Sequence, residues 1–349
     1  MSARRNDLPA LKAVLQARIR ELVRELAPEG SERGGIWTAK NPTRNDRNAG
    51  SFVVWLTKAP GAWKDYATQD KGDVIDLIAY CTGLAMKDAI AWARKWAAFE
   101  DLPDSARAAL AEKQAADRAE REARDAKKAA KDRSRAKAWW LSAERDLIGT
   151  PVARYLARRG IALEALDRTP SALRYVPDLM HRATGVSGPA MMAALVDDDG
   201  ICAVHRTWIT GAGAKASVLP NRMIWPSFRG GSIRLSRGLS RKSPAAASKA
   251  GIRETLVLCE GVEDGLSLAL VAPELRIWAA ASLGNLGAIR LPECCAQVIV
   301  CADNDFGKPA AARLLASAVG ALEAQGRPVE VMRSMIGKDF NDQLRGVTA

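Results

Sequence analysis

The chain has 349 residues, a length that allows two or three domains, and 48% of them are hydrophobic, so it can bury sizeable cores. Its 52 Lys and Arg against 40 Asp and Glu give a formal net charge of +12, which favours a polyanionic partner such as nucleic acid over a merely basic surface. No stretch of about 18 apolar residues occurs and the N-terminus lacks a signal-peptide core, so we expect a cytoplasmic protein that does not enter a membrane.

The first 100 residues predict a small domain in which helical stretches flank short strands. Residues 1–27 have the spacing of an amphipathic helix. Residues 31–73 are rich in Gly, Asn, Asp, Trp and Thr and contain the strand-like pieces SFVVWL and GAWKDYA. Helical spacing returns with DVIDLIAYCTGLAMKDAIAWARKWAAF. We therefore predict a first domain at residues 1–100.

Two further regions precede the C-terminal part. Residues 104–146 mix Ala, Lys, Arg, Glu and Asp without Gly, which is typical of a long solvated helix. We interpret residues 101–148 as a charged helical linker rather than an element that binds DNA directly. Residues 149–253 begin with the helical stretch PVARYLARRG, and the tight turn DDDG then joins two strand-like pieces as a hairpin. This region predicts a mixed α/β subdomain.

Residues 254–349 alternate between apolar strands and helices. The strands ETLVLCE, LRIWAAAS, AQVIVCAD and PVEVMRS occur with the helical stretches VEDGLSLALVA and KPAAARLLASAVGALEAQG. Such alternation predicts a parallel sheet covered on both faces, with right-handed crossovers. The predicted fold class is therefore α/β and α+β in several domains, with a Rossmann-like domain at the C-terminus.

Acidic side chains follow three of these strands where each strand ends. They are Glu260, Asp264, Asp303, Asp305, Asp339 and Asp342. Because ligands of an open parallel sheet bind at the carboxyl ends of its strands, we expect these acids to converge. Clustered carboxylates without His or Cys favour Mg²⁺ or Mn²⁺, and nucleotidyl transfer is a chemistry that uses them. A single Asp at a strand end is more often a turn residue or an N-cap.

The segments LVLCEGVEDGLSLAL, VIVCADNDFGKPAAARLLA and GKDFND resemble the toprim domain shared by bacterial-type primases, topoisomerases and some nucleases. The resemblance implies that Glu260, Asp303 and Asp305 are the catalytic and metal-binding acids of that family. It implies that Asp264 and Asp339 bind metal as well. The last acid of the family's pattern is replaced by Asn341, with Asp342 beside it as a candidate ligand.

The first domain resembles the zinc ribbon of bacterial primases, with the stretch KGDVID in register. Asp65 and Thr68 stand where the ribbon has its two late cysteines, and residues 41–44 stand in place of the first pair. The chain has six cysteines, none in a C-x-x-C pair, and two histidines. We therefore expect a DNA-binding domain that holds no zinc.

Residues 188–236 resemble the mixed α/β subdomain that precedes toprim in primase-like proteins of phages and integrated mobile elements. In primases that subdomain presents basic side chains to template and nucleotide. The resulting candidates for binding nucleic acid or nucleotide, with one lysine of the C-terminal domain added, are Arg206, Lys215, Arg222, Arg229, Arg234 and Lys338.

Together these resemblances imply a DNA primase-like nucleotidyltransferase that uses Mg²⁺ or Mn²⁺ and nucleoside triphosphates to make short primers on single-stranded DNA, in the replication of a phage or mobile element. The stretch GAGAKAS lacks P-loop spacing, so a replicative helicase would be a separate partner. The alternatives are a toprim nuclease and a non-catalytic DNA-binding replication factor, and the intact Glu260, Asp303 and Asp305 argue against the latter. A topoisomerase is disfavoured because the four tyrosines lie in helix or strand contexts.

Overall fold

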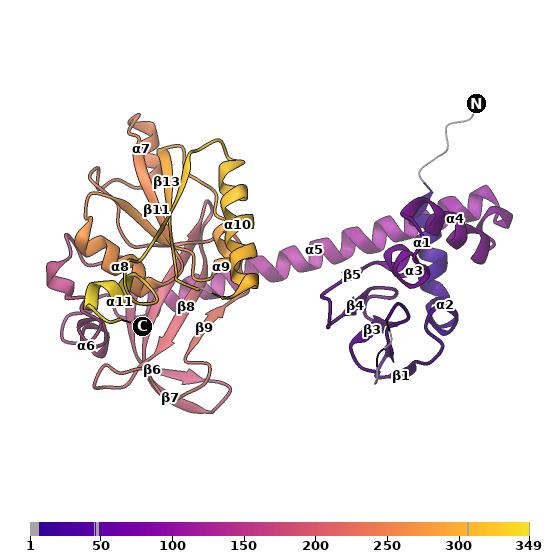
Figure 1. The fold of residues 1–349 in the computed structure, drawn as a ribbon, viewed down its shortest axis with the longest axis horizontal. Coiled ribbons are helices and arrows are strands. Elements are labelled where there is room, and N and C mark those ends of the chain that lie inside the picture. The colour runs from indigo at the N-terminus through magenta and orange to yellow at the C-terminus, as the bar shows by residue number, and fades with distance from the viewer. Residues whose placement is uncertain (1–6, 45, 47–48, 306, 349) are drawn as a thin grey trace. The chain divides into compact units, whose positions relative to one another are not determined.

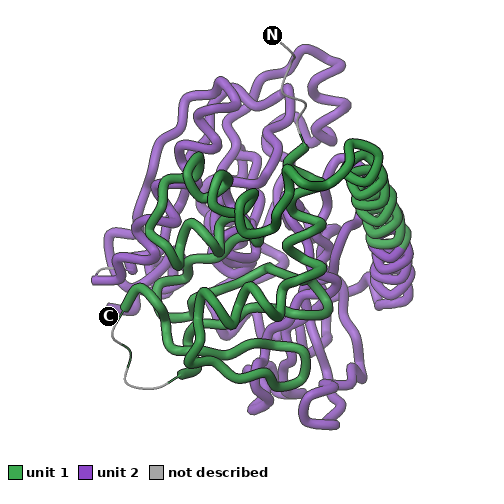
Figure 2. The backbone as a smooth tube through the Cα atoms, turned by 90° about the vertical axis from the view of Figure 1, so that its right-hand side faces the viewer, with its two compact units in different colours: residues 1–127 green, residues 128–349 purple. Residues whose placement is uncertain are grey.

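A computed structural model describes residues 7–44, 46, 49–305 and 307–348 of the chain. The chain forms two compact units, residues 1–127 and residues 128–349 (Figure 2). Of the helices that the structure describes, none is long and apolar enough to span a membrane.

The first unit is a five-stranded antiparallel sheet with helices on one face (Figure 1). Its strands, in spatial order, are β1 (Ser31–Arg33), β2 (Ile36–Ala39), β3 (Phe52–Trp55), β4 (Trp63–Asp65) and β5 (Lys71–Gly72). Its helices are α1 (Leu8–Ala17), α2 (Ile19–Leu26), α3 (Val74–Thr82), α4 (Met86–Trp96), η1 (Phe99–Asp101) and the first part of α5 (Asp104–Ser142). The single helix expected over residues 1–27 is interrupted at Arg18, which leaves helical geometry so that α1 and α2 can each bury an apolar face.

Alternate residues of β2, β3 and β4 point to opposite faces of this sheet. Trp37, Phe52 and Trp63 are buried in a core that includes residues of α1–α4. Trp55 and Lys64 lie on the other face and are only half-buried. The sheet therefore has one face for its core and one that remains accessible.

The carboxylate of Asp65 lies on the buried face of the sheet and is fully enclosed. It accepts hydrogen bonds from Asn41 Nδ2 at 2.7 Å, from Arg44 Nη1 at 2.9 Å and from the Ala67 amide at 2.8 Å. Polar side chains thus connect Asp65 with residues 41–44, the two regions where the resembling ribbons carry cysteines. Thr68 does not take part, because its hydroxyl bonds the exposed Asp70.

Helix α5 is the long, charged helix expected from the sequence, and most of its length is exposed. Its last turns differ from a simple spacer. Trp139 and Trp140 pack against Val204 and Met192, and Ala143 completes this small apolar cluster. The C-terminal end of α5 is therefore part of the core of the second unit.

The second unit contains a four-stranded antiparallel sheet. Its elements are α6 (Pro151–Ala157), η2 (Leu163–Ala165), β6 (Leu173–His181), β7 (Val186–Asp197), β8 (Gly200–Trp208) and β9 (Arg222–Trp225). The strands follow the order β6-β7-β8-β9, and Asp197 pairs with Gly200 across the turn between β7 and β8. The hairpin expected at DDDG is present.

A second sheet of this unit carries the alternating C-terminal elements. Its strands, in spatial order, are β10 (Ile233–Arg234), β12 (Arg276–Ala279), β11 (Glu254–Cys259), β13 (Cys295–Ala302) and β14 (Val329–Arg333). The helices are α7 (Pro244–Lys249), α8 (Val262–Val271), α9 (Leu283–Leu286), α10 (Pro309–Glu323) and α11 (Phe340–Arg345). The last four strands are parallel, whereas β10 is antiparallel to β12. Residues of α8 share a core with one face of the sheet, and residues of α9 and α10 share one with the other, so the predicted architecture is confirmed.

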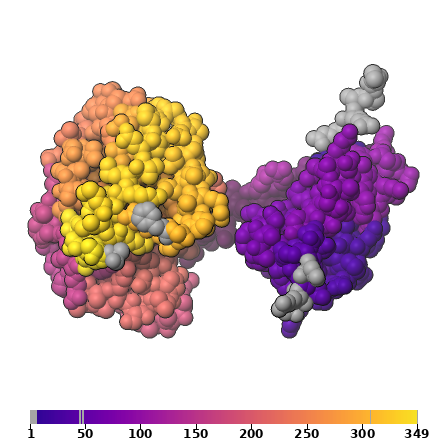
Figure 3. All heavy atoms as spheres, in the orientation of Figure 1, coloured from indigo at the N-terminus to yellow at the C-terminus, as the bar shows by residue number. Residues whose placement is uncertain are grey.

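The two sheets of the second unit share one apolar core. This core joins Met191 and Ala203 of the antiparallel sheet to Val257 of β11 and Leu266 of α8, and Tyr155 of α6 belongs to it as well. Both sheets also contribute to the surface of the unit seen in Figure 3, where the orange and yellow C-terminal part adjoins the salmon-coloured β6–β7 hairpin. Residues on either side of position 253 thus form one packed body, which fixes β8 and β9 relative to the ends of β11 and β13.

We expect the first unit to keep its fold in a zinc chelator and to lose stability in acid. Burial alone would raise the pKa of Asp65, but hydrogen bonds from Arg44, the Ala67 amide and Asn41 outweigh it, so its pKa lies below the ordinary value of 3.8. This stabilisation is complete above pH 3.8 and is lost as the pH falls below it. Thermal unfolding with EDTA at pH 7, and at a series of pH values from 5 downwards, measures both effects.

Elemental analysis of the purified protein accompanies these scans. One zinc ion per chain, or a fall in Tm on chelation, would contradict a polar network that replaces a metal.

Candidate active site

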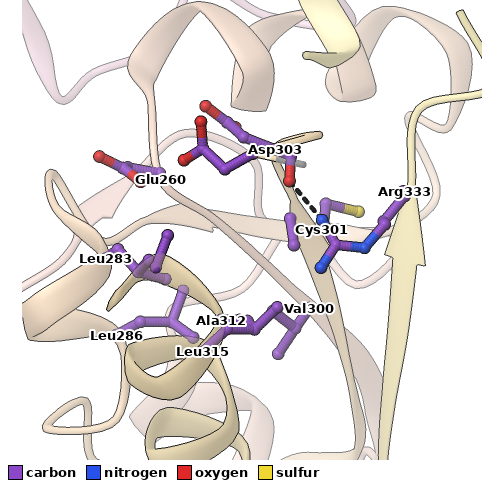
Figure 4. Close-up of a pocket in the computed structure, with 12 residues that line it drawn as sticks. Glu260, Leu283, Leu286, Val300, Cys301, Asp303, Ala312, Leu315 and Arg333 are labelled. Atoms are coloured by element: carbon purple, nitrogen blue, oxygen red, sulfur yellow. Dashed lines mark hydrogen bonds between the residues drawn. The ribbon is translucent and has the colours of Figure 1, made fainter. Parts of the chain in front are cut away.

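Two adjacent parallel strands place acidic residues side by side at one edge of the second unit's parallel sheet. Glu260 directly follows β11, and Asp303 directly follows β13. Cys259, the last residue of β11, is paired in register with Cys301, the last but one residue of β13, so the two acids leave adjacent strands within one residue of each other. Figure 4 shows both at one end of a pocket whose other walls include Leu283 and Leu286 of α9 and Leu315 of α10.

The carboxylates of Glu260 and Asp303 are poorly solvated and share a negative field. Burial raises the pKa of Glu260, and the charges of Asp303 and Asp305 raise it further. Burial likewise raises the pKa of Asp303, although Lys338 opposes this with its ammonium group 3.4 Å from Asp303 Oδ2. Burial therefore disfavours the charged form of both carboxylates, and a cation bound between them would favour it.

Asp264 adds a third carboxylate beneath this pair. It lies in the first turn of α8, is 8% exposed, and accepts a hydrogen bond from the Asn341 amide at 3.1 Å. Burial and the charges of Asp339 and Asp303 raise its pKa to about 7. Asp264 and Asp339 therefore belong to the same electrostatic cluster as Asp303.

The remaining acids predicted from the sequence lie at the margin of the cluster. Asp305 lines the pocket, but it pairs with Lys308 at 2.7 Å, which lowers its pKa. Asp339 caps α11 by accepting from the Asp342 amide at 2.8 Å. The Asp342 carboxylate accepts a hydrogen bond from the backbone amide of Lys338 at 3.2 Å, which ties the start of α11 to the residues just before it.

Asn341, which departs from the toprim pattern, has a structural use. It is 1% exposed, and its Nδ2 donates to the Arg159 carbonyl at 2.8 Å and to Ser267 Oγ at 3.0 Å. It thereby ties α11 to α8 and to the end of α6. With its amide engaged in this way, Asn341 serves packing rather than the acidic cluster.

The chemistry of the cluster suits a hard divalent cation. Glu260, Asp264 and Asp303 offer only carboxylate oxygens, which Mg²⁺ and Mn²⁺ prefer, and a cation among them would relieve their repulsion. Across the described ranges, no three His, Cys, Asp or Glu side chains are arranged closely enough to hold an ion.

The basic residues expected to bind nucleic acid or nucleotide have different surroundings. Arg206 is 7% exposed, with its guanidinium over Trp139 and Trp208, and Arg234 packs over Trp278. These two arginines therefore pack against tryptophans inside the unit, whereas Arg229 is exposed.

Arg222 and Lys215 lie closer to the acidic edge. Arg222 donates to Glu263 Oε1 at 2.5 Å, and the Tyr155 hydroxyl donates to the same oxygen at 2.5 Å. Lys215 is exposed, and partial desolvation and the charges of Arg222 and Arg159 lower its pKa. Glu263 was not among the site residues predicted from the sequence. Its position in the first turn of a largely apolar helix could have indicated it as a candidate.

The comparison with protein families agrees with this geometry. Residues 255–349 match the toprim domain family. The C-terminal part of the chain is therefore a toprim domain, as the sequence predicted, and Glu260, Asp264 and Asp303 lie in it. Residues 130–235 match a family described as a domain of unknown function (DUF7146). No curated protein matches the chain.

Several solved structures are distantly similar to the chain. The zinc-binding and RNA polymerase domains of the Aquifex aeolicus primase are 17% identical with a TM-score of 0.39, over 99% of this chain and 83% of that chain. A DNA primase domain from Pseudomonas aeruginosa is 16% identical with a TM-score of 0.40, over 61% and 74%. The primase fragment of the bacteriophage T7 primase-helicase protein is 13% identical with a TM-score of 0.33, over 88% and 94%.

Proposed function

We propose that this protein is a primase-like nucleotidyltransferase that joins nucleotides into short strands on single-stranded DNA, in the replication of a phage or mobile element. The observation that supports it most is the pair Glu260 and Asp303, held by adjacent parallel strands of a toprim domain in surroundings that raise both pKa values. A strand end that needed only a turn residue or an N-cap would not require two half-buried acids on adjacent strands.

The acidic cluster supplies the ligands for Mg²⁺ or Mn²⁺. Glu260 and Asp303 would hold the ion, with Asp264 and Asp339 close enough to shape the same field. The bound ion supplies charge neutralisation at the α-phosphate and at the leaving pyrophosphate. Lys338, beside Asp303, adds a positive charge for the phosphate oxygens.

The transfer itself is a displacement at phosphorus. The 3′-hydroxyl oxygen of the growing strand bonds to the α-phosphorus of a nucleoside triphosphate, and the bond from that phosphorus to the bridging oxygen of pyrophosphate breaks. The hydroxyl proton has to leave, and Glu260 is placed to accept it on a carboxylate oxygen. Its raised pKa suits this role, because a base with a pKa nearer neutrality accepts protons more readily.

The accessible face of the first unit's sheet is our candidate for the template. Lys64 Nζ lies 4.6 Å from the ring centroid of Tyr66, and the Tyr66 side chain is 52% exposed. Trp55 lies on the same face as Lys64. It belongs to β3, which pairs with β4, and Val53 of β3 is in register with Lys64 of β4. Aromatic rings beside cations bind single strands by stacking on bases and attracting phosphates, and Arg33 and Lys71 add charge at the edges of this face.

Asp303→Asn should abolish strand synthesis and leave the fold and most DNA binding intact. Asn keeps the shape of the side chain but removes one charge from the metal-binding field, so we expect a loss of at least about 100-fold in rate. The measurement is extension of labelled nucleotides on single-stranded DNA with Mg²⁺ or Mn²⁺, with Tm recorded for each variant. Glu260→Gln should behave alike.

Asp342→Asn is the matched control, since Asp342 lies in the first turn of the neighbouring helix α11 but accepts a hydrogen bond from the Lys338 amide. It should retain most of the synthesis. Near-normal synthesis by folded Asp303→Asn protein would overturn the catalytic proposal, and a shortened template in place of new strands would identify a toprim nuclease.

Tyr66→Ala and Trp55→Ala should each weaken binding of single-stranded DNA. Loss of one stacked base costs about 1–3 kcal/mol, or roughly 5- to 150-fold in affinity. If about five phosphates are neutralised, log K of the wild type should fall with log[salt] at a slope near −3.5. Fluorescence titrations with an oligonucleotide at several salt concentrations measure both quantities.

Trp92→Ala provides the comparison, because Trp92 is a half-buried tryptophan of α4 in the same unit and stacks on Trp96. Its DNA affinity should equal that of the wild type. Equal losses in all three variants, or a flat salt response, would argue against the sheet face as the template site.

A further inference from the structure

A second cavity adjoins the acidic pocket and shares Glu260 with it. Its volume is about 380 Å³, within the range of small-molecule sites. One part of its wall is the β11–α8 loop with Glu260 and Val262, and the other is formed by β8 and β9 with His205, Arg222 and Ile224. The cavity therefore extends from the acidic edge of the toprim sheet toward the antiparallel sheet.

His205 is a buried polar residue of this wall that lacks a partner. It is 8% exposed and forms no hydrogen bond with any residue that the structure describes, and its Nδ1 is completely buried. The other histidine, His181, differs, since its ring nitrogens lie 2.9 Å from Thr184 Oγ1 and 3.1 Å from the Pro220 carbonyl oxygen. Because protein atoms enclose Nδ1 and His205 lines the cavity, Nε2 is the ring nitrogen that can bond a ligand or an ordered water there.

The charge state of His205 fixes what it can recognise. Burial lowers its pKa to about 4, so the ring is neutral at pH 7 and offers one N–H donor and one acceptor. Such a ring suits an uncharged hydroxyl or a base edge rather than a phosphate.

The cavity has a mixed lining. Glu260 and Arg222 contribute charged groups, and Arg222 Nη2 is held by Glu263. Met223, Ile224 and Val262 contribute apolar side chains, and His205 lies among them. A nucleotide has the same combination of chemical groups, with charged phosphates and a flat, largely apolar base that carries a few polar atoms.

Resting on the proposed function, we infer that this cavity receives the nucleoside part of a nucleotide whose phosphates lie at the Glu260–Asp303 edge, with His205 forming a hydrogen bond to the sugar or the base. Arg222 would meet the phosphate end. The nucleoside could belong to the incoming triphosphate or to the 3′-terminal nucleotide of the growing strand, which share this chemistry.

The test compares binding of ATP and of inorganic tripolyphosphate by isothermal titration calorimetry, in Mg²⁺ and without DNA. His205→Phe keeps a flat ring but removes both nitrogens. It should weaken ATP binding about tenfold or more, leave tripolyphosphate binding unchanged, and leave Tm equal or higher because an unpaired polar atom is gone. His205→Gln, whose amide reaches toward the position of Nε2, should retain more ATP affinity than His205→Phe.

His181→Phe is the matched control with the opposite expectation. It removes two hydrogen bonds and should lower Tm while the folded protein binds ATP with wild-type affinity. A 5′-phosphorylated dinucleotide, titrated in parallel, distinguishes the two sources of the nucleoside. Selective loss of ATP affinity in His205→Phe indicates the incoming triphosphate, and selective loss of dinucleotide affinity indicates the strand end.

Photo-crosslinking of wild-type protein with 8-azido-ATP tests the site without any substitution. We expect the label on a peptide that contains β8, β9 or the β11–α8 loop. A label elsewhere would overturn the inference. Unchanged ATP and dinucleotide affinity in His205→Phe would overturn it as well, leaving a water as the partner of His205. Because these are binding measurements, they remain informative if the wild type makes no strands, which would count against the proposed function alone.

Discussion

The candidate site of the second unit depends on the repulsion between acidic side chains that parallel strands bring to one edge of their sheet. Cys259 and Cys301 are paired in register near the ends of β11 and β13, so Glu260 and Asp303 leave the sheet within one residue of each other. The carboxylates of Glu260 and Asp303 are partly desolvated, and the ammonium group of Lys338, which pairs with Asp303, opposes the resulting rise in both pKa values. Such a cluster is costly for a protein that has no cation to bind, and this cost is the strongest physical reason to regard the edge as a metal site.

The shared core explains how the antiparallel sheet can take part in a site built on the toprim domain. Packing of Met191 and Ala203 against Val257 and Leu266 fixes β8 and β9 beside the β11–α8 loop. The buried triad of Tyr155, Arg222 and Glu263 reinforces this contact with hydrogen bonds between α6, β9 and α8. Two regions that read as separate domains in the sequence therefore enclose one cavity.

The parallel sheet and the positions of the acids were predictable from the sequence, because apolar runs alternate with helices and Glu260 and Asp303 directly follow two of those runs. The partners of individual side chains were not. The arginines at 206 and 234 have the same local sequence signal as Arg222, yet tryptophans from distant segments cover them. The replacement of a late acid by Asn341 looked like a lost ligand, whereas its hydrogen bonds to Arg159 and Ser267 join elements far apart in the chain. His205 gave no signal, since its lack of a partner is a property of the folded cavity.

The central claim is that the edge formed by Glu260 and Asp303 binds a divalent cation, and thermal unfolding as a function of Mg²⁺ concentration tests it most directly. A ligand that binds only the native state raises Tm with concentration, so the wild type should show a progressive rise. Asp303→Asn should show a much smaller rise, and Asp342→Asn should follow the wild type. A wild-type Tm that does not change with Mg²⁺, or an equal rise in Asp303→Asn, would contradict the account.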